Sequence, residues 1–175
     1  MKKVSITSLS FILLLLATVA TSCSKNLASF SDKPDAPVWE NNQQTGEPVS
    51  KKDVNAKVVK SFYRSYGEQT AANWTRTARG FNVTFKNDGV NTLVYYTPGG
   101  REESKLRFYF ENKLPAEVRH IVKSNFYDYS ILYVTEVQKN DATAFYIKMQ
   151  DSSTLKTIRL VNEDWDVVED LARLH

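Results

Sequence analysis

One pattern of apolar residues occurs twice along this chain of 175 residues, and it constrains the fold more than any other feature of the sequence. The matching segments lie 60 to 64 positions apart: Ala56–Val58 with Ala116–Val118, Phe81–Phe85 with Phe145–Met149, and Thr92–Leu93 with Thr154–Leu155. An internal repeat of this length indicates one supersecondary unit that is used twice. We interpret residues 51–112 and 113–170 as tandem copies of a helix followed by four antiparallel strands.

The first copy begins with an amphipathic helix, predicted over residues 51–66. Ser50 and Asp53 have the spacing of a capping box, and Gly67 is a stop signal at the other end. Apolar residues recur on one side at helical spacing: Val54, Val58, Val59, Phe62 and Tyr66. Strands are predicted over residues 73–78, 81–86, 91–97 and 106–110, with a hairpin turn at residues 86–89.

The second copy repeats this order after Pro115, which occupies a position typical of a helix start. A helix is predicted over residues 115–126, with Val118, Ile121 and Val122 on its apolar face. Four strands follow it, over residues 130–138, 143–150, 154–161 and 165–168.

Two such copies predict an α+β domain, residues 51–175, with one long antiparallel sheet and both helices on one face. The other face then contacts solvent, and strand alternation predicts these residues on it: Asn82, Thr84, Arg107, Tyr109, Tyr146, Lys148 and Gln150. Because Tyr and Arg are frequent at binding surfaces, Arg107, Tyr109, Tyr146 and Lys148 are the candidate partner-binding residues. A purely structural reading stays open, since tyrosine also favours strands without any partner.

The first 23 residues have the layout of an export signal. Lys2 and Lys3 precede a mostly apolar run over residues 9–20, and small residues then lead into Cys23. A cysteine at this point resembles the lipobox of bacterial lipoproteins, although Ala20 stands where that pattern prefers Leu. The resemblance implies a signal peptide over residues 1–22 and a lipidated Cys23 that holds the protein at a membrane. A plain cleaved signal and an uncleaved anchor are the alternatives.

The segment that follows, residues 23–50, is rich in Ser, Asn, Gln and Pro and lacks apolar periodicity. Such a composition is typical of a flexible tether, from which only Val38 and Trp39 depart. Losing Lys2 and Lys3 with the signal leaves 21 basic against 20 acidic residues, so no nucleic-acid partner is expected.

The sequence offers little catalytic chemistry. Cys23 is the only cysteine, and the two histidines, His120 and His175, are far apart in sequence and have no neighbouring cysteine. Acidic residues gather around Trp165, and we interpret them as solvated turn residues rather than as a paired-carboxylate catalyst or a calcium site. We therefore expect a non-enzymatic protein without a metal or another cofactor.

The layout resembles the PepSY-like family, also called beta-lactamase-inhibitor-like lipoproteins. The resemblance covers about residues 52–168 and rests on short motifs in a fixed order: Phe62-Tyr63, Tyr66, Trp74, Phe81–Phe85, Val94–Gly100, Leu114-Pro115 and Phe145–Met149. It implies tandem helix-plus-four-strand units in an exported protein that binds proteins or peptides. The sequence departs from the family pattern at residues 101–103 and 162–165, so specificity does not carry over.

Together these features predict a lipid-anchored protein of the bacterial cell envelope that binds an unidentified protein or peptide through the open sheet face. Ser24 follows Cys23 without an Asp retention signal, which favours the outer membrane, on its periplasmic or surface side. The alternatives are inhibition of a peptidase or beta-lactamase, and a scaffold role in an envelope complex.

Overall fold

The computed structural model of the protein describes residues 46–68 and 71–173. The predicted signal peptide (1–22), Cys23 and most of the predicted tether (23–50) lie outside the described residues. The elements in chain order are β1 (Glu47–Val49), η1 (Lys51–Asp53), α2 (Ala56–Tyr66), β2 (Asn73–Thr77), β3 (Gly80–Asn87), β4 (Val90–Tyr96), β5 (Glu102–Tyr109), η2 (Glu111–Lys113), α3 (Ala116–Asn125), β6 (Ser130–Lys139), β7 (Ala142–Gln150), β8 (Thr154–Val161) and β9 (Asp164–Ala172).

The described strands form one antiparallel sheet of nine, so the predicted α+β class with a single long sheet is confirmed. Strand order in the sheet follows the sequence from β1 to β9, because each strand pairs with the next one along the chain. Two of the connections are two-residue hairpins with positive φ at both positions: Asp88 and Gly89 between β3 and β4, and Asn140 and Asp141 between β6 and β7. Such turns match the twist of paired strands.

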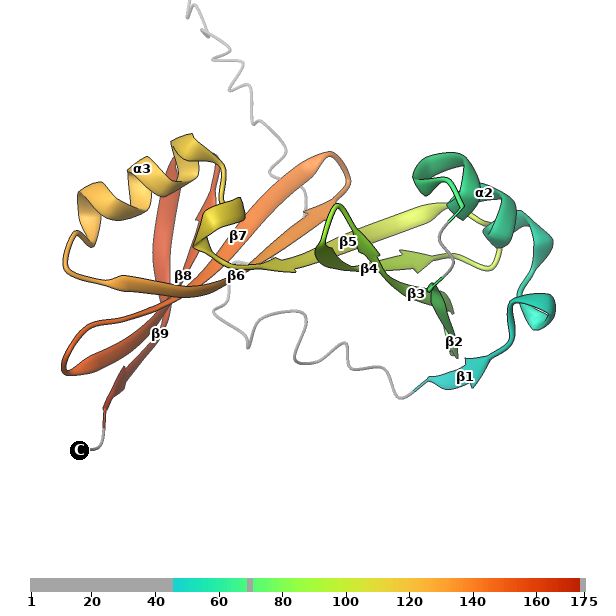
Figure 1. Cartoon of the computed structure of the whole chain (residues 1–175), viewed down its shortest axis with the longest axis horizontal. Coiled ribbons are helices and arrows are strands. Elements are labelled where there is room, and N and C mark those ends of the chain that lie inside the picture. Colours follow the sequence, from blue (N-terminus) through green and yellow to red (C-terminus); the bar gives the residue numbers. More distant parts are fainter. Residues whose placement is uncertain (1–45, 69–70, 174–175) are drawn as a thin grey trace, which may run out of the picture.

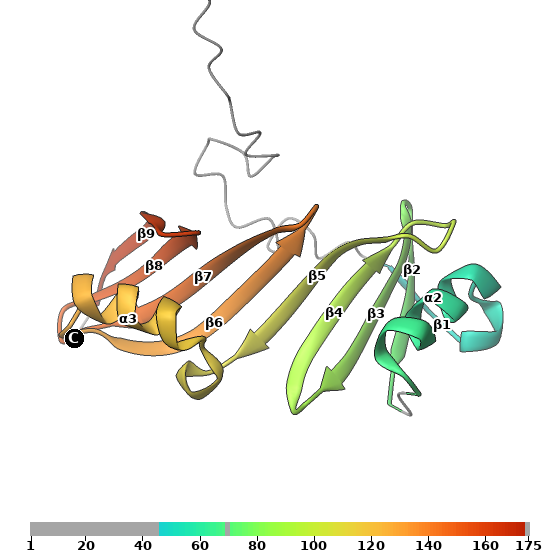
Figure 2. The ribbon, with the colours of Figure 1, turned by 90° about the horizontal axis from the view of Figure 1, so that it is seen from above.

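Each α-helix packs against its own part of the sheet. Val58 and Phe62 of α2 are fully buried in a cluster with residues of β2, β3 and β4: Trp74, Phe81, Val83, Phe85, Val94 and Tyr96. Val118 and Val122 of α3 are buried in a second cluster, mostly with residues of β6, β7 and β8: Ile131, Val134, Ile147, Met149, Ile158 and Leu160. Figure 1 shows both helices above the sheet, and Figure 2 shows them at opposite ends of it.

The face without helices is the inner side of a curved sheet. In Figure 1 the outer strands at both ends, β1–β2 and β8–β9, bend downwards and away from the helices. Right-handed strand twist accumulates over many strands and produces such curvature. We call this the concave face.

Several predicted boundaries change. Glu47–Val49, assigned to the tether, pairs with β2 as the edge strand β1. Three residues are too few to show the alternation that predicts a strand. The first helix does not begin at the Ser50 capping box, because residues 51–53 form a separate 3-10 turn. Its N-cap is Asn55, whose side chain accepts the Lys57 amide at 2.9 Å. β9 continues to Ala172, four residues beyond the predicted end of that strand.

Candidate partner-binding surface

The four candidate partner-binding residues lie on two different faces of the sheet. In an antiparallel sheet, residues that are directly opposite each other point to the same side. Arg107 pairs with Thr92 and Glu136, and Tyr109 pairs with Val134, so both lie on the helix-covered side. Tyr146 and Lys148 alternate with Ile147, which packs under α3, so both lie on the concave face. The expectation that all four share one surface is therefore wrong.

The reason is a reversal of the polar and apolar sides of β5. This strand lies between the areas covered by the two helices, so its helix-side positions Lys105 and Arg107 have no apolar cover, and only Tyr109 at its end joins the α3 cluster. Polar residues occupy those positions, and the apolar residues Leu106 and Phe108 point to the concave face. Alternation in the sequence is correct for β5, but it does not say which set faces the helices.

On the helix side, Arg107 and Tyr109 belong to a hydrogen-bonded network centred on Glu136. The Glu136 carboxylate accepts hydrogen bonds from Arg107 Nη1 at 2.9 Å, Tyr109 Oη at 2.7 Å and Gln138 Nε2 at 2.6 Å. Glu136 is 4% exposed, and a buried carboxylate needs such donors to be tolerated. Burial and this carboxylate raise the pKa of Tyr109 well above its usual value, so its hydroxyl stays a donor. The network joins the two halves of the sheet.

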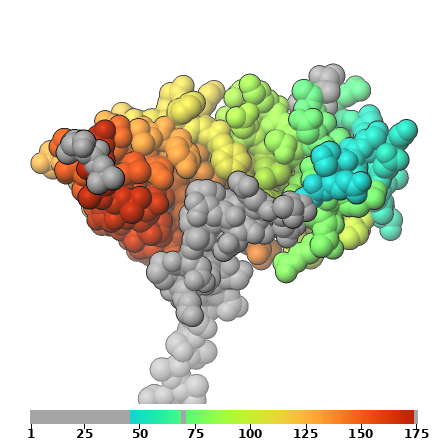
Figure 3. Space-filling model, turned by 90° about the horizontal axis from the view of Figure 1, so that it is seen from below, coloured from blue at the N-terminus to red at the C-terminus, as the bar shows by residue number. Residues whose placement is uncertain are grey.

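The concave face carries its own apolar cluster, which the sequence analysis did not predict. Its buried members are Leu106, Val137, Ala144 and Tyr146, and the partly buried residues around them are Leu93, Tyr95, Phe108, Val161 and Val168. These side chains come from six consecutive strands, β4 to β9. Figure 3 views the molecule from this side, with β8 and β9 at one end and β1 to β4 at the other.

Charged residues border this cluster on the side of β8 and β9. Lys148 Nζ lies 3.1 Å from Glu169 Oε2, and Arg159 Nε donates to Asp166 Oδ1 at 2.9 Å. The Thr157 hydroxyl, which donates to Glu169 at 2.8 Å, and Lys148 hold the pKa of the Glu169 carboxyl below its usual value. An apolar centre with a charged border is the usual anatomy of a protein-binding surface.

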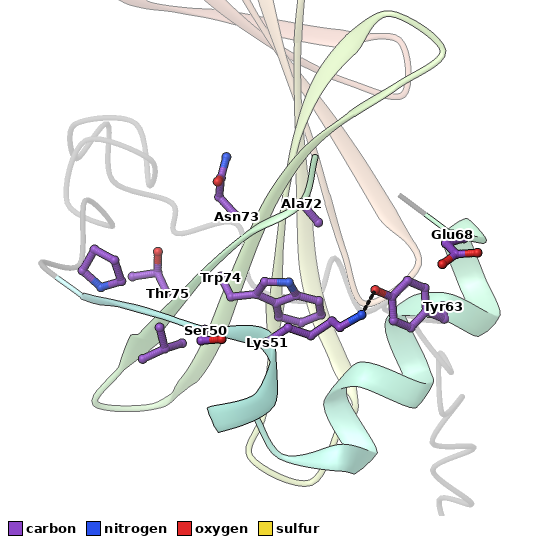
Figure 4. Close-up of a pocket in the computed structure, with 10 residues that line it drawn as sticks. Ser50, Lys51, Tyr63, Glu68, Ala72, Asn73, Trp74 and Thr75 are labelled. Atoms are coloured by element: carbon purple, nitrogen blue, oxygen red, sulfur yellow. Dashed lines mark hydrogen bonds between the residues drawn. The ribbon is translucent and has the colours of Figure 1, made fainter. Parts of the chain in front are cut away.

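A separate groove lies at the other end of the sheet, between β1, η1, α2 and β2. It encloses about 730 Å³ and is lined by Trp74, Tyr63, Lys51 and Glu68, among others (Figure 4). Lys51 Nζ donates to the Tyr63 hydroxyl at 3.1 Å, the hydrogen bond drawn as a dashed line in Figure 4. The same nitrogen lies 5.2 Å from the centre of the Tyr63 ring. This groove was missed because β1, which forms one wall, was assigned to the tether.

The described part of the chain offers no group of three or more His, Cys, Asp or Glu side chains placed to hold a metal ion. His120 is exposed on α3, as its position on the polar side of the helix predicts. Over residues 46–68 and 71–173, neither helix is long and apolar enough to cross a membrane. Asp164 and Asp166 lie on β9 rather than in a turn, and Asp166 is paired with Arg159.

The fold resembles that of the BLIP-like proteins. A BLIP-like protein from Bacteroides fragilis superposes with a TM-score of 0.53 at 14% sequence identity, covering 68% of this chain and 86% of that one. A DUF2874 family protein from Bacteroides ovatus gives a TM-score of 0.55 at 14% identity, with 68% and 87% covered. A Bacteroides eggerthii protein described as periplasmic gives 0.54 at 18% identity, with 68% and 88% covered. At these identities the likeness concerns the fold alone.

Comparison of the sequence with family models and with curated proteins gives no match.

Proposed function

We propose that this chain is a lipid-anchored protein of the bacterial envelope that binds a protein or peptide partner on the concave face of its sheet. The observation that carries the proposal is the apolar cluster on a face where neither α-helix packs. Its centre is buried, and the accessible apolar surface comes from the partly buried residues around it, Leu93, Tyr95, Phe108, Val161 and Val168. Contiguous apolar patches rimmed by charges usually mark interaction sites. Tyr146 and Lys148 belong to this surface, whereas Arg107 and Tyr109 support it from behind.

The two halves of the sheet support the further proposal of a tandem repeat. Three buried positions recur at an offset of 60: Val54 with Leu114, Val58 with Val118, and Phe62 with Val122. The 3-10 turns η1 and η2 are separated by the same 60 positions. A PepSY-like origin would account for this doubling, and β1 is then an addition to the first unit.

The envelope location is proposed from the N-terminal signal pattern and from Cys23. The similar Bacteroides eggerthii protein is described as periplasmic, which fits an exported domain of this fold. Mass spectrometry of the mature N-terminal peptide tests the anchor, since a lipidated Cys23 carries the mass of its acyl chains. A Cys23→Ser chain recovered in the membrane fraction like the wild type would contradict it.

The binding face is tested by photo-cross-linking in cells that naturally make the protein. A photoreactive phenylalanine analogue replaces Phe108 on the concave face or, as the control, exposed Glu117 on α3. We expect one adduct of defined size from position 108 and none from 117. Equal adducts from both positions, or none from 108, would overturn the proposal.

A second control uses the opposite side of the same strand. Tyr109→Phe removes a hydrogen bond to the buried Glu136 carboxylate and should cost about 1.5–3 kcal/mol of stability. Because Tyr109 faces the helix side, we expect the adduct from position 108 to persist in this variant.

Inhibition of a beta-lactamase or peptidase is the alternative that the fold favours, because one of the similar structures is a BLIP-like protein. A panel of such enzymes assayed with about 10 μM protein tests it, since specific complexes dissociate in the nanomolar to micromolar range. Unchanged activity across the panel would remove this reading. Recovery of a large, stable assembly in detergent would instead favour a scaffold subunit.

A further inference from the structure

The last strand of the sheet, β9, has a free outer edge. It is nine residues long, and in the described chain only β8 pairs with it. The Arg173 amide donates to Ser153 O at 2.8 Å, and donors alternate along a strand. The amides of Asp170 and Ala172 therefore point away from β8, towards the outer edge. The opposite edge, β1, has only three residues and contains Pro48, which has no amide hydrogen.

Exposed apolar side chains flank this edge. Trp165 is 39% exposed, Val167 42% and Leu171 48%. Trp165 pairs with Leu160 and Val167 with Ile158, so Trp165 and Val167 lie on the helix side. There the centres of the Trp165 and Phe126 rings are 4.9 Å apart. Natural sheets usually shorten or cover edges of this kind, because they accept further strands.

The charge of β9 selects among possible strands. Four of its nine residues are acidic and none is basic. Lys148 and Arg159 pair with Glu169 and Asp166, but from the β8 side, so the outer side of these carboxylates remains available. Asp164 is exposed and pairs with no cation among the described residues. Two copies of β9 side by side would place like charges together, which is destabilising.

We propose that the outer edge of β9 binds an extended peptide segment with alternating basic and apolar side chains, added to the sheet as a further strand. Its backbone would accept hydrogen bonds from the amides of Asp170 and Ala172. Its Lys or Arg side chains would lie on the concave side, next to Asp164, Asp166 and Glu169. Its apolar side chains would lie next to Trp165 and Val167. Strand addition of this kind obtains affinity from the backbone and specificity from the side chains.

Blocked synthetic peptides test the proposal with the full-length protein in detergent at low ionic strength. The probe is the peptide Lys-Val-Lys-Thr-Lys-Val-Lys, labelled for fluorescence anisotropy. One control replaces every Lys by Glu, and the other replaces the central Thr by Pro, which breaks strand pairing. We expect each control to bind at least about tenfold more weakly than the probe. Similar affinity for all three peptides, or no binding of the probe, would overturn the proposal.

A matched pair of protein variants locates the site. Asp170→Ala and Asp170→Pro both remove the ion pair with Lys156, but only the proline removes the outward amide. We expect about a further tenfold loss of probe affinity in Asp170→Pro relative to Asp170→Ala. Equal affinity of the two variants would contradict strand addition at β9.

Two further measurements keep the outcome interpretable. If circular dichroism shows that Asp170→Pro does not fold, Ala172→Pro removes the next outward amide at the end of the strand. Sedimentation without peptide tests the competing occupant: a dimer that Asp170→Pro dissociates would assign the edge to a second copy and overturn the proposal. Cross-linking from Phe108 reports the concave face independently, so the two proposals can fail separately.

Discussion

The two helices dock on one sheet with side chains of different chemistry. Phe62 of α2 is fully buried and meets four aromatic rings, with centroid distances of 4.9 to 5.5 Å: Tyr63, Tyr66, Trp74 and Phe85. The corresponding position in α3, Val122, is 1% exposed and lies in a cluster whose buried members are all non-aromatic except Tyr109. Aromatic contacts have preferred angles, whereas aliphatic contacts depend mainly on volume. The comparison shows that one backbone arrangement accommodates two kinds of core.

The loops after the third strand of each half also differ, in how each one contacts the helix of its half. The loop between β4 and β5 contains Gly100, whose backbone approaches the first turn of α2 so closely that an added Cβ would lie 2.6 Å from Lys57 O. The turn between β8 and β9 has two residues, Asn162 and Glu163, and the contact to the α3 end is made by the Trp165 and Phe126 rings. At these two contacts, α2 is met by loop backbone at its first turn, whereas the end of α3 is met by a side chain of β9.

The largest expected effect comes from truncating the aromatic centre. Phe62→Ala should lower the free energy of unfolding by about 3–5 kcal/mol, because it leaves a cavity surrounded by rings. Val122→Ala removes two methylene-sized groups and should cost about 2 kcal/mol. Urea denaturation of both variants measures the difference, and equal losses would show that the two cores do not differ as their contacts indicate.

A pair of glycine variants tests the loop contrast. Gly100 and Gly89 both have positive φ, +85° and +78°, so alanine is strained at either position. Gly89 has no heavy atom within 4 Å of an added Cβ, and Gly89→Ala should cost only about 1 kcal/mol. Gly100→Ala also forces the loop away from α2 and should cost about 2–4 kcal/mol. Similar unfolding midpoints for the two variants would mean that the close approach does not support the helix.

The sequence predicted most of the fold because periodicity reports the buried side of each element. Phe81, Val83, Ile147 and Met149 lie in the helix-side cores, as their alternation predicted. β5 was assigned the wrong way round because most of its helix-side positions lie between the two helix contacts and lack apolar cover, a fact that depends on the neighbouring elements. Glu136 gave no local signal, since its three donors come from β5 and β6 only after the strands have paired. The concave cluster was missed for the same reason.

The smallest expected effect concerns the hairpin turns between the second and third strands of each half. The β3–β4 turn is formed by backbone conformation at Asp88 and Gly89, whereas the β7–β8 turn depends on a carboxylate. Asp151 Oδ1 accepts the amides of Ser153 at 2.7 Å and Thr154 at 2.6 Å, together with both hydroxyls. The amides of Ser153 and then Thr154 hold the pKa of Asp151 well below its usual value.

A carboxyl with a lowered pKa stabilises the fold above its unfolded pKa, and this contribution is lost as the pH falls towards the folded value. The Tm difference between wild type and Asp151→Asn should therefore be largest at about pH 6 and change little until the pH approaches 3.8, the ordinary pKa of an aspartate carboxyl. Below that pH the difference should shrink. Gly89→Ala in the other turn changes no titratable group, so its Tm difference should not follow this profile. Thermal unfolding between about pH 6 and pH 2 measures both curves. Parallel curves for the two variants would mean that the β7–β8 turn, like its counterpart, is held by backbone conformation alone.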